Sequence, residues 1–419
     1  MKLILIISVL FLSPCWKPSV AEAFPDHKND PRVTGPLGRA INDAWRVSWE
    51  RFFHPDTEMF YDYLSSYEKD KWLSHLPVAD EVKRQYPNFQ GYDTGMEDCM
   101  ISAGVMLTMI VDKYAVTKDE GLRKSAHAVF SGIKRSTGAQ GFLARCVCTE
   151  DHQSIYINSS RDQYTHAVHG LWYYFNSPLC DAKTRKEIRV LLSAYADRMI
   201  RNVISGNDYD FLRADGTRDT RGISRMWNVQ GHEAARLPMI YAAAWNTTGN
   251  KHYYRLYRKY VVPAIEQSFS VGEKTTTYAY LQMACSLELL ESLEKETILK
   301  EKISRIKEMV AERCKSRAEN ADKNSQTLDL TRAGTDWRTG EGLKPQGEYR
   351  KVWYNIRESG EAALTQLMVL EKNIDPAQKE LLVKAIERLD YDRVSSNGIF
   401  YLQAAYWKAR RSGVFNEND

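Results

Sequence analysis

The sequence predicts an all-α fold in which helical hairpins close into a toroid. Apolar residues recur at helical spacing along almost all of the 419 residues, and hardly any stretch alternates as a strand does. The expected helices form antiparallel pairs joined by short polar turns. Some segments echo each other, such as 113–124 with 244–259 and 180–192 with 374–386. Long loops rich in Asp, Trp, Arg and His favour a toroid with a mouth over an open superhelix.

Two capping patterns mark helices in the first half of the chain. Thr94 and Glu97 have the spacing of a capping box, which predicts that a helix begins just after Thr94. Ser160 and Gln163 have the same spacing and predict a second helix start. A short extended piece is expected at 141–147, before that second helix. The helices expected in this half are 37–53, 95–114, 118–133, 161–176 and 181–204.

Small residues and turn signals organise the second half. A run of small residues predicts a helix over 234–245, and the polar turn 246–250 separates it from its return helix. The remaining expected helices are 252–269, 278–293, 298–317, 357–370, 376–389 and 400–409. The stretches 206–224 and 318–353 are expected to be long loops.

The N-terminus has the pattern of a secretory signal peptide. Lys2 precedes an apolar run from Leu3 to Leu12, and Ala21-Glu22-Ala23 forms a cleavage site. We therefore expect cleavage after Ala23, a single catalytic domain over 24–419, and a periplasmic or secreted protein. No other apolar run is long enough to span a membrane. The formal charge of +4 and the lack of basic tracts with interleaved aromatics argue against nucleic acid as a partner.

The cysteines permit disulfides but do not predict a pairing. Removing the signal peptide leaves an even number of cysteines, which an oxidising compartment could pair. Cys146 and Cys148, with His152 nearby, resemble half of a zinc site, but no second pair follows at zinc spacing. We expect no metal and no cofactor. The six remaining cysteines are Cys99, Cys146, Cys148, Cys180, Cys285 and Cys314.

The helix expected at 161–176 carries polar groups along one face. Asp162, His166 and His169 follow each other at helical spacing, together with Thr165 and Tyr173. Solvated helix faces are usually rich in Lys and Glu, whereas this face combines histidines, an aspartate and a tyrosine. The composition therefore indicates a face that lines a functional cleft.

Short motifs around this helix resemble a known family. The segment Tyr92-Asp93-Thr94-Gly95-Met96 is similar to an H-D-x-G-[FM] motif that opens an inner helix, although Tyr92 stands where His is usual. The turn YAVTKDEGLRKSA and the interval from Asp93 to Asp162 also match that family. The chain thus resembles the six-hairpin (α/α)6 glycosidases, especially the unsaturated glucuronyl hydrolases and related uronic-acid-releasing hydrolases. The resemblance implies that Asp93 and Asp162 are the catalytic residues.

Glycoside hydrolysis suits these carboxylates, because it needs one protonated acid and one ionised carboxylate beside the bond. We expect Asp162 to donate the proton and Asp93 to stay ionised. Loop arginines, including Arg145 and Arg225, could bind the carboxylate of a uronic acid. The expected substrate-binding residues are Asp98, Arg161, His166, His169, Trp227, His232, Trp337 and Arg338.

The sequence therefore leads to a hydrolase hypothesis with two alternatives. The main hypothesis is a secreted glycoside hydrolase that acts on a uronic-acid-containing oligosaccharide. A polysaccharide lyase on the same toroid would instead use Tyr164, His166 or His169 to remove a proton, with Asn158 or Arg161 neutralising the uronate. A glycan-binding protein without catalytic activity is the third possibility.

Overall fold

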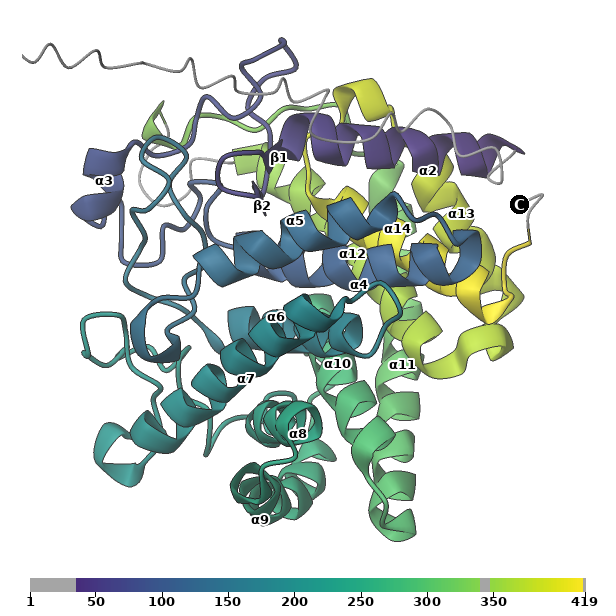
Figure 1. The fold of residues 1–419 in the computed structure, drawn as a ribbon. Coiled ribbons are helices and arrows are strands. Elements are labelled where there is room, and N and C mark those ends of the chain that lie inside the picture. Colours follow the sequence, from purple (N-terminus) through teal and green to yellow (C-terminus); the bar gives the residue numbers. More distant parts are fainter. Residues whose placement is uncertain (1–34, 340–346, 417–419) are drawn as a thin grey trace, which may run out of the picture.

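A computed structural model describes residues 35–339 and 347–416 of the chain. The expected signal peptide and its cleavage site after Ala23 lie outside these residues. Within them the protein is an all-α toroid, which is the fold class that the sequence predicts (Figure 1).

Six long helices of the described part form an inner ring. Each packs against the next one in the ring, and α14 packs against α4, so the ring is closed. These helices are buried on almost every side; in α4 even Asp112 and Lys113 are buried. The inner helices are α4 (Cys99–Thr117), α6 (Arg161–Phe175), α8 (Arg236–Thr248), α10 (Thr277–Leu293), α12 (Gly347–Leu370) and α14 (Gly398–Ser412).

The outer layer consists of helices that alternate with the inner ones along the chain. Each packs on one or two inner helices through an apolar stripe, as α5 does through Leu122, Ala126, Val129 and Ile133. The outer helices are α2 (Gly35–Val47), α5 (Leu122–Arg135), α7 (Ala182–Asn202), α9 (Lys251–Ser268), α11 (Thr297–Ser325) and α13 (Pro376–Glu387).

Side-chain caps begin several outer helices. The Asp181 carboxylate accepts from the Thr184 N–H at the start of α7, and the Asn250 side chain accepts from the His252 N–H at the start of α9. The smaller elements are β1 (Phe53–His54), which pairs antiparallel with β2 (Met59–Phe60), and the short helix α3 (Ala79–Lys83).

The predicted helix start at Thr94 is wrong, because α4 begins at Cys99. Asp93 and Gly95 both have positive φ angles, 64° and 88°, which no α-helix contains. The Glu97 carboxylate instead accepts from the N–H groups of Asp93 and Gly95, each at 3.1 Å, and closes a tight turn. The capping-box spacing thus marks a turn that precedes the helix.

The loop expected at 318–353 is too long at both ends. Helix α11 continues to Ser325, and α12 begins at Gly347. The extension of α11 is buried only through Ala318 and Ala321, so the sequence shows no strong apolar stripe there. The helix expected at 37–53 also changes character, because residues 48–52 form a π-helical turn.

Among the described residues, α4 is the helix long and apolar enough to cross a membrane. Most of it is buried inside the protein. Its hydrophobicity is accounted for by its place in the inner ring.

Candidate functional site

A cleft of about 510 Å³ opens at one end of the ring. Its walls come from the residues just before and within the first turns of inner helices, which places the N-terminal ends of these helices around one mouth. Loop residues complete the walls. The lining residues are Tyr63, Tyr92, Asp93, Glu97, Asp98, Ile101, Arg145, Ser160, Arg161, Asp162, Ile223, His232, Glu233, Arg236, Tyr278, Gln282, Tyr349, Arg350, Trp353, Tyr354 and Arg357.

The cleft brings together five of the expected catalytic and substrate-binding residues, and also the loop arginine Arg145. Asp93 and Asp98 come from the turn before α4, Asp162 and Arg161 from the first turn of α6, and His232 from the segment before α8. Residues that are far apart in the chain thus share one mouth, as the toroid prediction requires.

Asp162 forms an ion pair with Arg236, whose side chain is almost completely buried. Burial opposes ionisation of Asp162, but the guanidinium groups of Arg236 and Arg161 outweigh it and lower the pKa of the carboxyl. About 30% of the Asp162 side chain remains exposed. These surroundings favour an ionised Asp162 and do not fit the proton donor that we expect there from the sequence.

Glu97 has the opposite environment. Burial, followed by the negative charges of Asp98 and Asp93, raises the pKa of Glu97 to about 8, although two backbone N–H groups favour its ionised form. The carboxyl lines the cleft and is protonated near neutral pH. Glu97 is not among the residues that the sequence predicts for the site, because its capping-box spacing with Thr94 offers a complete structural explanation.

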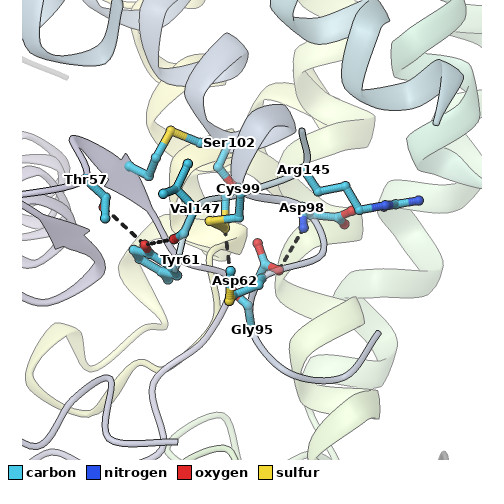
Figure 2. The surroundings of a disulfide bond; sticks show 12 residues. Thr57, Tyr61, Asp62, Gly95, Asp98, Cys99, Ser102, Arg145 and Val147 are labelled. Atoms are coloured by element: carbon cyan, nitrogen blue, oxygen red, sulfur yellow. Dashed lines mark hydrogen bonds between the residues drawn. A yellow bond between two sulfur atoms is a disulfide. The ribbon is translucent and has the colours of Figure 1, made fainter. Parts of the chain in front are cut away.

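Asp62 lies behind this group and is completely buried. One oxygen of its carboxyl group accepts from the Asp98 N–H at 2.8 Å. Figure 2 shows this hydrogen bond as a dashed line. Burial and the neighbouring charges of Glu97 and Asp98 raise the pKa of Asp62 well above its usual range. The surroundings of this second carboxyl group, which is hydrogen-bonded to the cleft residue Asp98, therefore favour its neutral form.

Asp93 has a left-handed backbone conformation, and so does Gly95 in the same turn. Its carboxylate accepts from Arg350 at 3.1 Å. Burial raises the pKa of Asp93, and the charge of Arg350 opposes this shift. Asp93 thus lies at the cleft as expected, but its surroundings do not favour ionisation as strongly as those of Asp162.

His232 is half-buried at the cleft, 3.7 Å from the Glu233 carboxylate. Burial lowers the pKa of the imidazole, aided by the positive charges of Arg236 and Arg161 and opposed by Glu233. The ring is therefore neutral near pH 7 and can accept a proton.

The two histidines expected on the cleft face of α6 lie deeper in the ring. His166 is buried, and burial lowers its pKa to about 3. His169 lies 2.7 Å from Glu288; burial opposes its protonation, but Cys285 and Glu288 raise its pKa to about 10. The cleft reaches only the first turn of α6, so residues one and two turns further along are part of the interior.

Three other expected ligand residues also lie outside the cleft lining. The Trp227 ring packs edge-on against Tyr260, with centroids 4.7 Å apart. Trp337 is buried and donates its indole N–H to the His75 carbonyl at 2.8 Å. Arg338 pairs with Glu81 at 2.6 Å. Each side chain is engaged in packing or in a local ion pair.

A disulfide joins Cys99 to Cys146 directly beside the cleft (Figure 2). Asp98 and Arg145, which both line the cleft, are the neighbours of these two cysteines. The bond therefore connects the start of α4 to the segment that carries Arg145. No cluster of metal-ligating side chains occurs within the described ranges.

Comparisons with known proteins give no family assignment. No family model matches the chain, and no curated protein matches it. Similar solved structures include a sugar epimerase from a ruminal bacterium, with 12% identity and a TM-score of 0.48 over 87% of this chain and 98% of the other. Two more are cellobiose 2-epimerase from Spirochaeta thermophila, with 10% identity and a TM-score of 0.46, and a D-mannose isomerase, with 10% identity and a TM-score of 0.44. Each match covers 90% of this chain and 98% of the other. The resemblance to unsaturated glucuronyl hydrolases stays a prediction, and the description of the toroid depends on the helix contacts of this chain itself.

Proposed function

We propose that this protein is a glycoside hydrolase that cleaves an oligosaccharide containing a uronic acid. The observation that supports this most directly is a pair of cleft carboxyl groups with opposite pKa shifts. Glu97 is protonated near neutral pH, whereas Asp162 is ionised. One neutral and one charged carboxyl are what glycoside hydrolysis needs.

In the proposed reaction Glu97 donates its proton to the glycosidic oxygen as the bond to the anomeric carbon breaks. Asp162 supports the positive charge that develops on the sugar ring. A water molecule then adds to the anomeric carbon and releases a proton to a carboxylate, so that Glu97 is protonated again at the end of the cycle. Aromatic rings at the cleft, including Tyr92, Trp353 and Tyr354, offer surfaces on which sugar rings can stack.

We also propose that the protein acts outside the cytoplasm, in the periplasm or after secretion. The signal-peptide pattern is the basis of this proposal, and the Cys99–Cys146 disulfide agrees with an oxidising compartment.

His232 supports a second candidate, a lyase or another enzyme that removes a proton from a carbon atom of the sugar. Its neutral imidazole could remove a proton from a sugar carbon while Glu97 supplies one to an oxygen. The products separate the candidates: a lyase yields an unsaturated uronide that absorbs ultraviolet light, and a hydrolase yields two saturated sugars. Sugar binding without any product would support the glycan-binding alternative.

The test is a screen on uronide-containing oligosaccharides with product identification, followed by the Glu97→Gln variant. Because general acid catalysis contributes about 10²–10⁴-fold, we expect a loss of that size in kcat. Glu294→Gln is a control for the loss of a buried carboxyl group: Glu294 lies outside the cleft, also accepts from two backbone N–H groups, those of Lys295 and Glu296, and in addition pairs with Arg258 at 2.6 Å. A Glu97→Gln variant that folds and retains near-normal turnover would contradict the proposal.

A further inference from the structure

We propose that Arg145 binds the carboxylate of the sugar ring in the cleft and thereby determines the specificity for uronic acids. The proposal depends on the hydrolase hypothesis only in assuming that the ligand is a sugar. The geometric basis is a buried guanidinium group that faces the cleft and has no carboxylate partner among the described residues.

The other arginines of the cleft are neutralised by the protein. Two of them lie at the N-terminal ends of α6 and α8, and two lie in α12; all four form ion pairs. The pairs are Arg161 with Glu233, Arg236 with Asp162, Arg350 with Asp93, and Arg357 with Asp98. Additional binding of an anion at any of these groups would compete with a carboxylate that is already in place.

Arg145 differs from these four arginines in that it forms no ion pair with a carboxylate of the described residues. It is 3% exposed, and its Nη1 donates to the carbonyl oxygen of Glu97 at 2.9 Å. Its Nε is buried without a hydrogen-bond partner, and its guanidinium lies 5.3 Å from the centre of the Tyr92 ring. A buried cation of this kind is costly unless it is paired, and a ligand carboxylate would supply the missing partner.

The backbone holds Arg145 in a fixed position. The Met100 N–H donates to the Arg145 carbonyl at 3.0 Å, and the adjacent Cys146 is tied to Cys99. The side chain is therefore organised before a ligand arrives, so that little ordering entropy is lost on binding.

The place of Arg145 also indicates which sugar ring carries the charge: a ring close to the bond that is cleaved. Arg145 donates to the main-chain carbonyl of Glu97, and both residues line the cleft, so an anion bound to Arg145 lies in the same cleft as the proposed proton donor. Because Glu97 is neutral near pH 7, it does not repel that anion. The neighbouring Tyr92 ring, also contacted by Arg221 at 5.6 Å, gives the sugar an aromatic surface next to the charge.

Binding to the full-length mature protein tests the inference by calorimetry with three probes that share one ring: glucuronate, glucose and glucose 6-sulfate. Arg145→Met removes the charge and keeps much of the apolar stem. Arg198→Met is the matched control, since Arg198 is equally buried, donates to the carbonyls of Leu212 and Arg213, and lies over the Phe142 ring outside the cleft. Melting temperatures of both variants report any general loss of stability.

We expect Arg145→Met to weaken glucuronate binding about 10- to 100-fold, as the loss of charged hydrogen bonds implies, and to leave glucose binding unchanged. In Arg198→Met we expect the binding of all three probes to be unchanged. Arg145→Lys should restore only part of the affinity, because lysine lacks the bidentate fork. Equal loss for glucose and glucuronate, or a dependence on Arg145 for glucose 6-sulfate alone, would overturn the inference.

Hydrolysis is measured separately on the same variants. Charge-selective binding that depends on Arg145, in a protein that hydrolyses no glycoside, would support the inference and reject the hydrolase proposal. Turnover that is equal on neutral and uronate glycosides and unchanged in Arg145→Met would reject the inference and the uronate part of the proposed function, while supporting a glycoside hydrolase.

Discussion

At the scale of single residues, the cleft shows how neighbours give chemically similar side chains different states. Glu97 is buried beside the carboxyl groups of Asp98 and Asp93, and both effects favour its protonated form. Asp162 is held between Arg236 and Arg161, and their charges overcome the effect of burial. The two proposed roles follow from these surroundings rather than from the identity of either side chain.

The roles of Glu97 and Asp162 can be separated by the leaving group of the substrate. A nitrophenyl glycoside needs little protonation, so the loss of kcat in Glu97→Gln should shrink strongly on it relative to a natural glycoside. Asp162→Asn should lose about as much on both substrates, because it no longer stabilises charge on the sugar. A loss in Asp162→Asn that disappears with the nitrophenyl substrate would instead assign proton donation to Asp162.

The sequence could place five site residues at one mouth, because it puts each of them near a helix start and the predicted toroid brings these starts together. They are Asp93, Asp98, Arg161, Asp162 and His232. It could not assign the proton donor, since pKa shifts depend on partners from distant segments. Arg236, which determines the state of Asp162, lies 74 residues further along the chain. Likewise, nothing local in 161–176 reveals how deep in the ring each turn of α6 lies, and the expectation for His166 and His169 depended on that depth.

At the scale of elements, the cleft depends on the junction between the turn before α4 and the segment before α6. Met100 and Arg145 share a backbone hydrogen bond, and the adjacent cysteines share a disulfide. The Asp98 N–H is held by buried Asp62, which orients the turn further. Element boundaries were the weaker part of the sequence prediction here, because positive φ at Asp93 cannot be read from a capping-box spacing.

Removal of the disulfide by Cys99→Ala together with Cys146→Ala should lower the free energy of unfolding substantially. The bond closes a loop with a sequence separation of 47 residues, for which the chain-entropy relation gives about 4 kcal/mol. Denaturant unfolding of the variant measures the loss. Cys314→Ala, which alters a buried free cysteine of α11, is the control for the cavity alone. A double variant no less stable than this control would show that the bond contributes nothing to stability.

At the scale of the whole molecule, the closure of the ring between α14 and α4 brings together in the interior charged groups from three inner helices and a tyrosine from a fourth. Lys408 lies 3.4 Å from Asp112 and 3.6 Å from Glu288, and Tyr173 donates to Asp112 at 2.7 Å. The periodic helices and their echoes were sufficient to predict the toroid. This buried network could not be predicted, because its members are separated by most of the length of the chain.

The stability of the whole molecule should depend on pH through Glu97. Its folded pKa is raised from 4.5 to about 8, so the folded protein binds this proton more tightly than the unfolded chain. The stabilising contribution is therefore complete below about pH 4.5 and is lost as pH rises to about 8. The difference in unfolding free energy between wild type and Glu97→Gln, measured by denaturant titration, should be constant below this window, change across it in favour of the variant, and be constant again above it.

The turnover of the wild type should fall over the upper part of the same pH window, because the proton donor is being ionised. A difference that is independent of pH from 4 to 9, or a turnover that rises through pH 8, would remove Glu97 as the protonated group of the cleft.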